Sequence, residues 1–410
     1  HFWKNKLQSW DKWLFIFLIL GLVSLFFARF PSHGAKQLIF LVNTYLLYLV
    51  SLLAVDSEFL DGKDFKALIY YIKLSLLFTV VLGFVQYFLT FFSAPYYFWQ
   101  YWATLVSSSY YGQGLANVLA YSNSWFSAEG SGQSLRMFGI LQDTHAFSVV
   151  VIFALLFWVA RAKVATSQSA TKVLGFIKLQ TGWFWFGLVV LCFALIASGT
   201  RGAWLSMLAP VTVAIFLFFI YRARILLILP ILSYVLVVVL FILSPFISQG
   251  LNWIRTVSSN DNFLQRASSI YDLNENSNAG RIEIWKSSLN FTLHHPFGTG
   301  YGNFISSIVS TDSVSKTASF EEVSAQKNLR YNLPQKFITA HSLYLHVLVE
   351  LGLAGLVLFG LMWLSFFAKL WRMLKVNNFI VSYETKFAVN VGLAMAWLLA
   401  YGLFDVTILN

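Results

Sequence analysis

The chain has 410 residues, of which 58% are hydrophobic, 18% aromatic and only 11% charged, and its mean hydropathy is +0.69. A water-soluble domain carries about one quarter charged residues, so this composition excludes a soluble enzyme with a single anchor and indicates a chain that crosses a lipid bilayer repeatedly. The net charge of +11 does not indicate a nucleic-acid partner, because many of the basic residues lie in short loops beside apolar segments, as membrane topology requires.

Nine apolar segments follow one another along the chain, and several are close to the ~20 residues that a helix needs to cross a bilayer. They are residues 13–28, 37–55, 67–92, 145–160, 183–199, 202–221, 225–247, 351–370 and 387–404. The fourth is the shortest, and we expect it to begin earlier, near Phe138. The predicted fold class is an all-α polytopic membrane protein with about nine transmembrane helices, in which residues 1–410 form one integral-membrane domain.

The basic residues of the short loops predict which side of the membrane each loop faces. Residues 161–178 carry four Lys or Arg and no acid, and the loops around Arg222 and Arg372 fall on the same side if the segments alternate. That side is predicted to be the cytoplasm. Two long loops, 93–144 and 248–340, then lie outside.

The stretch "SGTRGAW" places Arg201 at the outer end of a tight hairpin between two apolar segments. One interpretation is an interfacial arginine that extends to the membrane surface and anchors the hairpin. The surrounding Ser, Gly and Thr favour another, because a short polar turn leaves backbone N–H groups available and lets a ligand approach closely. The ligand that suits this place is an anion.

The stretch "NAGRIEIWKSSLNFTLHHPFGTGYGNF" predicts that Arg281 opens an amphipathic helix that ends at His294, His295 and Pro296. A helix C-terminus favours histidine, and no suitably spaced acid or cysteine indicates a metal site. The Gly-x-Gly-x-Gly turn that follows does not come after a strand, so it is a weak indication of dinucleotide binding.

Two further stretches place ionisable groups at the outer membrane edge. In "AHSLYLHVLVELGLAGLVLFG", His341 is expected to begin a helix on which His346 and Glu350 share a face. A neutral imidazole there could take a proton from a hydroxyl, although an interfacial histidine with no catalytic role is more common. In "RMFGILQDTHAF", Asp143 and His145 enter the fourth segment, and helix capping is the favoured role of Asp143.

These stretches, in this order and with "GLFD" near residue 405, resemble the O-antigen ligase and O-antigen polymerase superfamily over about two thirds of the chain. The resemblance implies a GT-C-like glycosyltransferase of about twelve spans, three more than the nine predicted, so a terminal hairpin and a last helix are expected beyond the residues at hand. It also implies a glycan donor on undecaprenyl diphosphate, used at the periplasmic face of the bacterial inner membrane without a nucleotide sugar or other cofactor. The acceptor is a lipid A-core sugar in ligases, another repeat unit in polymerases and a protein hydroxyl in a third branch.

The resemblance also assigns residues to roles. The two phosphate-binding arginines of the family match Arg201 and Arg281, and its proposed base matches His341, while Ser342 stands where the family often has Asn. Asp143, His145, His346 and Glu350 are expected to support the site without a metal ion. We expect an O-antigen ligase, with the polymerase and the protein-glycosylating branch as alternatives. A lipid-linked glycan transporter is the alternative from another class. It predicts charged or broken helices near mid-membrane, often in repeated halves, whereas these segments are largely uncharged and show no internal repeat.

Overall fold

The computed structural model describes most of the apolar segments and part of the polar loops. The described residues are 9–56, 62–93, 101–102, 108–111, 126–129, 132–141, 143–159, 182–221, 235–239, 242–243, 276–304, 339–376 and 383–406. The chain divides into two compact units. Unit 1 is His1–Ile69, Asn274–Met373 and Gly402–Asn410, and unit 2 is Tyr70–Leu273 and Leu374–Tyr401.

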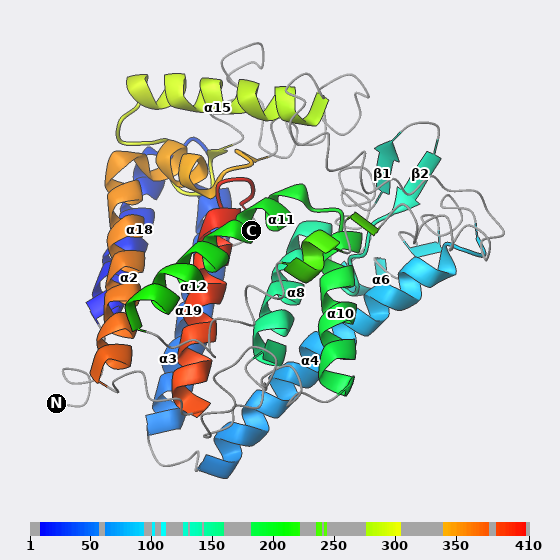
Figure 1. Ribbon diagram of the computed structural model, residues 1–410. Helices are drawn as coiled ribbons and strands as arrows, with labels where there is room; N and C mark the ends of the chain where they lie inside the picture. Colours follow the sequence, from blue (N-terminus) through cyan, green and yellow to red (C-terminus); the bar gives the residue numbers. More distant parts are fainter. Residues whose placement is uncertain are drawn as a thin grey trace. The chain divides into compact units, whose positions relative to one another are not determined.

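The described residues of unit 1 form most of its helices and a short turn of 3-10 helix, drawn in blue, yellow-green and orange in Figure 1. They are α2 (Ser9–Ser24), η1 (Leu25–Phe27), α3 (Pro31–Asp56), α15 (Asn276–His294) and α18 (Leu343–Val376). Aromatic rings join three of them, because Trp10 of α2 lies 4.8 Å from Tyr48 of α3 and 6.5 Å from Phe366 of α18, measured between ring centroids.

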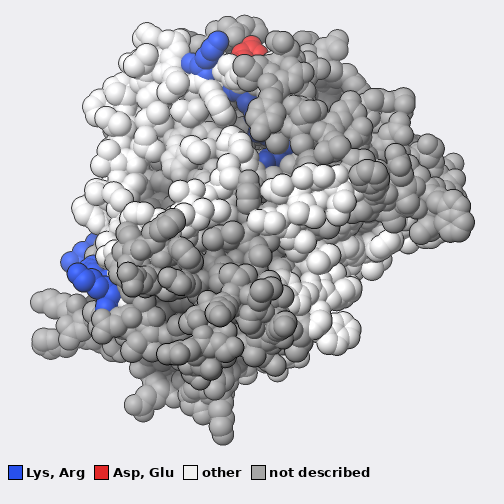
Figure 2. All heavy atoms as spheres, viewed as in Figure 1, with Lys and Arg blue, Asp and Glu red and all other residues white. Residues whose placement is uncertain are grey.

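Helix α18 carries no charged side chain between Glu350 and Lys369, as a bilayer-crossing segment requires. Its basic residues follow that apolar stretch, and Figure 2 shows Lys and Arg side chains gathered in separate places with uncharged surface between them. The charge distribution of this helix is therefore that of a membrane span with a basic end.

Helix α18 is broken at Gly352, whose φ of 65° and ψ of −167° lie in a region that essentially only glycine adopts. The break leaves backbone groups that the turn after α15 satisfies. The N–H of Leu353 donates to the carbonyl of Pro296 (3.1 Å), and the carbonyl of Glu350 accepts from the N–H of Gly300 (2.9 Å). The turn after α15 and the broken start of α18 are thus joined by backbone hydrogen bonds.

Unit 2 contains α4 (Gly62–Leu89, most of which belongs to it), α6 (Ser108–Tyr111), α8 (Thr144–Val159), α10 (Gly182–Ala197), α11 (Arg201–Ser206), α12 (Leu208–Tyr221) and α19 (Tyr383–Tyr401). It also contains a two-stranded antiparallel hairpin, β1 (Phe126–Glu129) and β2 (Gly132–Leu135), in which Phe126 pairs with Leu135. The described part of the fold is therefore helical, as expected, with one small hairpin before α8.

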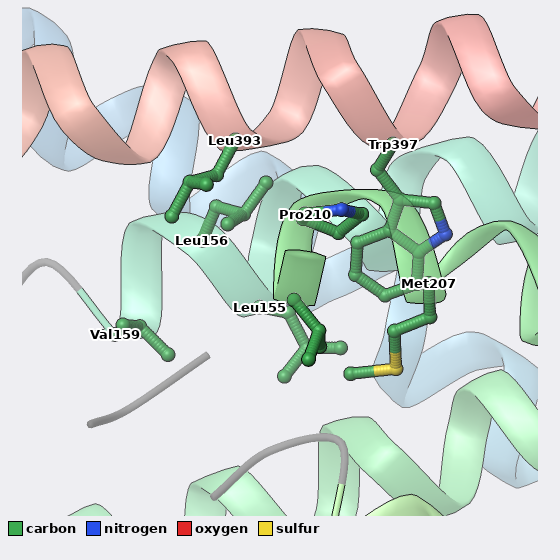
Figure 3. A pocket seen from close by; sticks show the side chains of 8 residues that line it. Leu155, Leu156, Val159, Met207, Pro210, Leu393 and Trp397 are labelled. Atoms are coloured by element: carbon green, nitrogen blue, oxygen red, sulfur yellow. The ribbon is translucent and has the colours of Figure 1, made fainter. Parts of the chain in front are cut away.

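The core of unit 2 forms where α8, α12 and α19 meet. Helix α8 packs against α10 and α19, and α19 also contacts α11 and α12. The indole N–H of Trp397 on α19 donates to the carbonyl of Ala203 on α11 (2.9 Å). Figure 3 shows a small pocket at this junction, lined only by apolar residues: Leu155, Leu156, Val159, Met207, Pro210, Val211, Leu393 and Trp397.

Three described segments are long and apolar enough to cross a membrane: Trp10–Phe27, Tyr70–Leu89 and Leu343–Lys375. Shorter apolar helices cover Thr144–Val159, Gly182–Ala197, Arg201–Leu217 and Phe387–Tyr401. This pattern is consistent with a membrane protein, while the total of nine spans stays a prediction because most of segment 225–247 lies outside the described residues.

One predicted boundary is wrong. Helix α8 begins at Thr144 and does not extend back to Phe138. The chain before it turns at Gly139, whose φ is 61°, and the N–H of Met137 donates to the carbonyl of Ala197 (3.0 Å). Pairing with the end of α10 therefore replaces the expected extra helical turn.

Candidate functional site

His341 has a backbone conformation that no other described non-glycine residue shares. Its φ of 46° is positive, and α18 begins only at Leu343, so the expectation that His341 begins the helix was wrong. The N–H of Leu343 donates to the carbonyl of Gly402 (2.6 Å), and the N–H of His341 donates to the hydroxyl of Thr339 (3.3 Å). Positive φ is uncommon for a non-glycine residue, and residues held in such strained conformations cluster at functional sites.

Arg281 lies on α15, which begins at Asn276, so Arg281 does not open the helix as predicted. The same helix contacts the residue before His341. The indole N–H of Trp285 donates to the carbonyl of Ala340 (3.0 Å), and Ile284 packs with Ala340 in one buried cluster. Arg281 precedes these two by about one helical turn and shares their face. The structure therefore brings the Arg281 face of α15 into the neighbourhood of His341.

His346 and Glu350 form the buried pair that their spacing predicts. The Nε2 atom of His346 lies 3.2 Å from Oε1 of Glu350, and both side chains are almost completely buried. The same oxygen accepts the N–H of Phe304 (3.1 Å), whose ring stacks on His346 at 4.8 Å between centroids. These contacts fix the turn that follows α15 to the first turns of α18.

Arg201 is the first residue of α11, and the turn Ser198–Thr200 joins α10 to it. Gly199 has a φ of 64°, which reverses the chain within three residues. Arg201 itself is half-buried. Its position directly after the turn agrees with the predicted place at the end of a tight hairpin. Arg201 belongs to unit 2, whereas Arg281 and His341 belong to unit 1.

A second arginine, Arg136, contacts the same turn and was not predicted as a site residue. It is 8% exposed, and its Nε donates to the carbonyl of Ser198 (2.8 Å) while its Nη2 donates to the hydroxyl of Thr200 (3.2 Å). No local signal in the sequence could have found it, because its two acceptors lie 62 and 64 residues further along the chain.

Asp143 and His145 have structural partners. The carboxylate of Asp143 accepts the N–H of Ala146 (2.7 Å), which confirms the capping role favoured from the sequence. The Nδ1 atom of His145 lies 2.8 Å from the hydroxyl of Tyr401 and the two rings stack, so His145 joins α8 to α19. Within the described ranges, no group of three His, Cys, Asp or Glu side chains could hold a metal ion.

The long apolar helices and the basic end of α18 are consistent with a helical membrane protein. Within that class, residues 186–360 match the family model described as O-antigen ligase. The match covers less than half of the chain, and it supports the resemblance to the O-antigen ligase and polymerase superfamily.

The members of this family are glycosyltransferase-like ligases and polymerases. The matched region includes Arg201, Arg281, His341, His346 and Glu350, whereas Asp143 and His145 lie before it. Searches of curated proteins and of solved structures found no match.

Proposed function

We propose that the protein is an O-antigen ligase that transfers a glycan from undecaprenyl diphosphate to a hydroxyl of the lipid A-core oligosaccharide. The reaction takes place at the periplasmic face of the bacterial inner membrane, with a GT-C-like arrangement of helices. The observation that carries the proposal is the strained His341 beside Ala340, against which the Arg281 face of α15 is docked. The proposal thus assigns a base and a cation to neighbouring segments of the region that matches the O-antigen ligase model.

The transfer is a single displacement. The imidazole of His341 takes the proton of the acceptor hydroxyl, whose oxygen forms a bond to the anomeric carbon of the donor sugar. The bond from that carbon to the phosphate oxygen breaks, its electron pair stays on the departing diphosphate, and the configuration at the anomeric carbon inverts.

The guanidinium groups of Arg201 and Arg281 hydrogen-bond to the diphosphate oxygens. Each planar guanidinium can hold two phosphate oxygens through charge-assisted bonds. Negative charge grows on the leaving group as the bond breaks, so fixed cations stabilise the transition state more than the bound donor. In this scheme the arginines supply the charge that a divalent metal ion supplies in other phosphate enzymes.

His346 and Glu350 take no part in proton transfer in this scheme. Both are engaged with each other and with the N–H of Phe304, and they hold the turn on which the start of α18 rests. Their loss is therefore expected to act through stability of the site and not through the chemical step.

The test is glycan transfer by the purified protein in lipid nanodiscs. The donor is a polyprenyl-diphosphate oligosaccharide, and the acceptors are lipid A-core, a second lipid-linked repeat unit and a hydroxyl peptide. We expect transfer to lipid A-core that His341→Ala lowers by about 10² to 10⁴ while donor binding persists. The matched control is His294→Ala, since His294 is exposed at the end of α15 and bonds the carbonyl of Asn290 within its own helix.

The acceptor that receives the glycan decides between the alternative functions. Transfer only to the repeat unit or only to the peptide would replace the ligase assignment by the polymerase or the protein-glycosylating branch. No transfer to any acceptor, together with movement of the donor across a proteoliposome membrane, would contradict the enzyme and favour the transporter. Full turnover of His341→Ala would exclude this residue as the base.

A further inference from the structure

Arg136 is a nearly buried cation that connects two segments far apart in the sequence. It follows β2 directly, and its two hydrogen bonds reach Ser198 and Thr200, which are 62 and 64 residues further along the chain. The backbone beside it makes the same connection, since the N–H of Met137 donates to the carbonyl of Ala197 (3.0 Å). The segment after β2 is therefore fastened along the end of α10 and the turn that follows.

The turn depends on Arg136 at two points. Nε meets the carbonyl of Ser198 and Nη2 meets the hydroxyl of Thr200, so one planar guanidinium spans the two residues on either side of Gly199. The hydroxyl of Thr200 also lies 3.3 Å from the carbonyl of Thr144, at the start of α8. A lysine could reach one of these acceptors but cannot reproduce the fixed fork of two donors.

Other contacts hold the two helices without Arg136. The indole N–H of Trp204 on α11 donates to the carbonyl of Leu195 on α10 (2.9 Å), and the hydroxyl of Ser198 is bonded to Leu195 and to Ser148. Removing the guanidinium is therefore expected to change the path of the turn while α10 and α11 stay folded.

We propose that Arg136 is a positioning residue that fixes the Ser198–Thr200 turn and thereby sets the direction in which α11 presents Arg201. The inference rests on the proposed function, because it gives Arg201 its task at the diphosphate. Arg136 acts through the turn and does not itself hold the donor. A displacement of about 1 Å in a charge-stabilising group lowers a rate by about 10²-fold, so the loss of Arg136 is felt in turnover.

The first measurement is backbone amide exchange, read by mass spectrometry, on the whole protein in nanodiscs. The N–H groups of Ser198 and Gly199 are bonded to the carbonyls of Ala194 and Ile196, so a fixed turn exchanges slowly. We expect Arg136→Gln and Arg136→Lys to raise exchange in peptides covering 197–204 several-fold, with α10 unchanged. The matched control is Arg372→Gln, since Arg372 is an exposed arginine of α18 that bonds the carbonyl of Ala368 in its own helix.

The second measurement is a double-mutant cycle on the rate of glycan transfer, with Arg136→Gln, Arg201→Ala and the double variant. If Arg136 acts through Arg201, the double variant is no slower than Arg201→Ala alone, whereas independent roles multiply. We expect Arg136→Gln alone to lower kcat by about 10- to 100-fold, with a smaller change in KM and only a partial rescue by lysine. Thr200→Val should reproduce part of this loss. Thr200→Ser keeps the hydroxyl and should retain the wild-type kcat.

The outcomes separate the inference from the proposed function. Unchanged exchange at 197–204 in both Arg136 variants overturns the inference, as do losses that multiply in the double variant, even if the wild type transfers glycan normally. If the wild type transfers no glycan, or if Arg201→Ala keeps full turnover, the assigned task of Arg201 fails and the positioning role falls with it. Raised exchange in that case would leave Arg136 as a structural clamp only.

Discussion

Glu350 is the residue whose replacement separates a structural from a chemical role most clearly. It is 2% exposed, and its Oε1 accepts hydrogen bonds from two buried donors, the N–H of Phe304 (3.1 Å) and Nε2 of His346 (3.2 Å). Glu350→Ala leaves both donors without this acceptor, at about 1–3 kcal/mol each, which agrees with the ~3–5 kcal/mol lost when one partner of a buried pair is removed.

Glu350→Gln removes the charge but keeps an oxygen where both donors can reach it. We expect this variant to lose no more than about 2 kcal/mol in the free energy of unfolding, because hydrogen bonds to a charged group exceed neutral ones by about that amount. The difference in the free energy of unfolding between the two variants separates the contribution of the acceptor oxygen from that of the side-chain charge.

The assay is reversible unfolding in mixed micelles, combined with amide exchange of residues 299–304 and glycan transfer by the folded fraction. Glu350→Ala should lower stability by about 3–5 kcal/mol and raise exchange at Phe304. Glu283→Ala is the control, since Glu283 is exposed on α15. A Glu350→Ala protein with wild-type stability and no transfer would refute the structural role and make the carboxylate part of the chemistry.

Four further results are expected. Gly352→Ala should destabilise the protein strongly, because its Cβ would collide with the carbonyl of Pro296 at a positive φ, whereas Gly360→Ala in the same helix meets nothing within 4 Å and should be neutral by thermal unfolding. Arg201→Ala and Arg281→Ala should each lower the transfer rate by about two to three orders of magnitude, with partial rescue by lysine. Transfer should persist in excess chelator, and loss with EDTA that magnesium or manganese restores would contradict the arginine scheme. Single cysteines in loop 248–340 should react with an impermeant reagent outside whole cells; labelling of only the basic loop after the fourth span would reverse the orientation.

Local sequence patterns predicted the structural features that depend only on residues close together in the sequence. The helices follow apolar runs, the Asp143 cap follows from an acidic residue before such a run, and the pairing of His346 with Glu350 follows from their spacing. The resemblance to the O-antigen ligase family was also recognisable from the sequence, and residues 186–360 match the model of that family.

Features set by distant partners were not predictable from one sequence. Gly352 lies in an apolar run that reads as continuous helix, and only the carbonyl of Pro296 and its neighbours show why the helix breaks there. The bond of Leu343 to Gly402, which follows the positive φ of His341, and the bond of Arg136 to Ser198 join residues far apart in the sequence, and no local pattern reveals them. Tertiary context decided these positions against the local preference of the chain.

The turn after α15 has a consequence for the synthesis of the protein. It is joined to the first helices of the chain, since the N–H of Tyr301 donates to the hydroxyl of Ser24 (2.9 Å) and the amide oxygen of Asn303 accepts the N–H of Phe30 (2.8 Å). Ser24 and Tyr301 are separated by 277 residues, which a ribosome adds in about 14–55 s at roughly 5–20 residues per second. The first helices therefore lack these hydrogen-bond partners for most of translation. If the ribosome stalls before the turn is made, these helices stay without their partners and are accessible to chaperones and proteases.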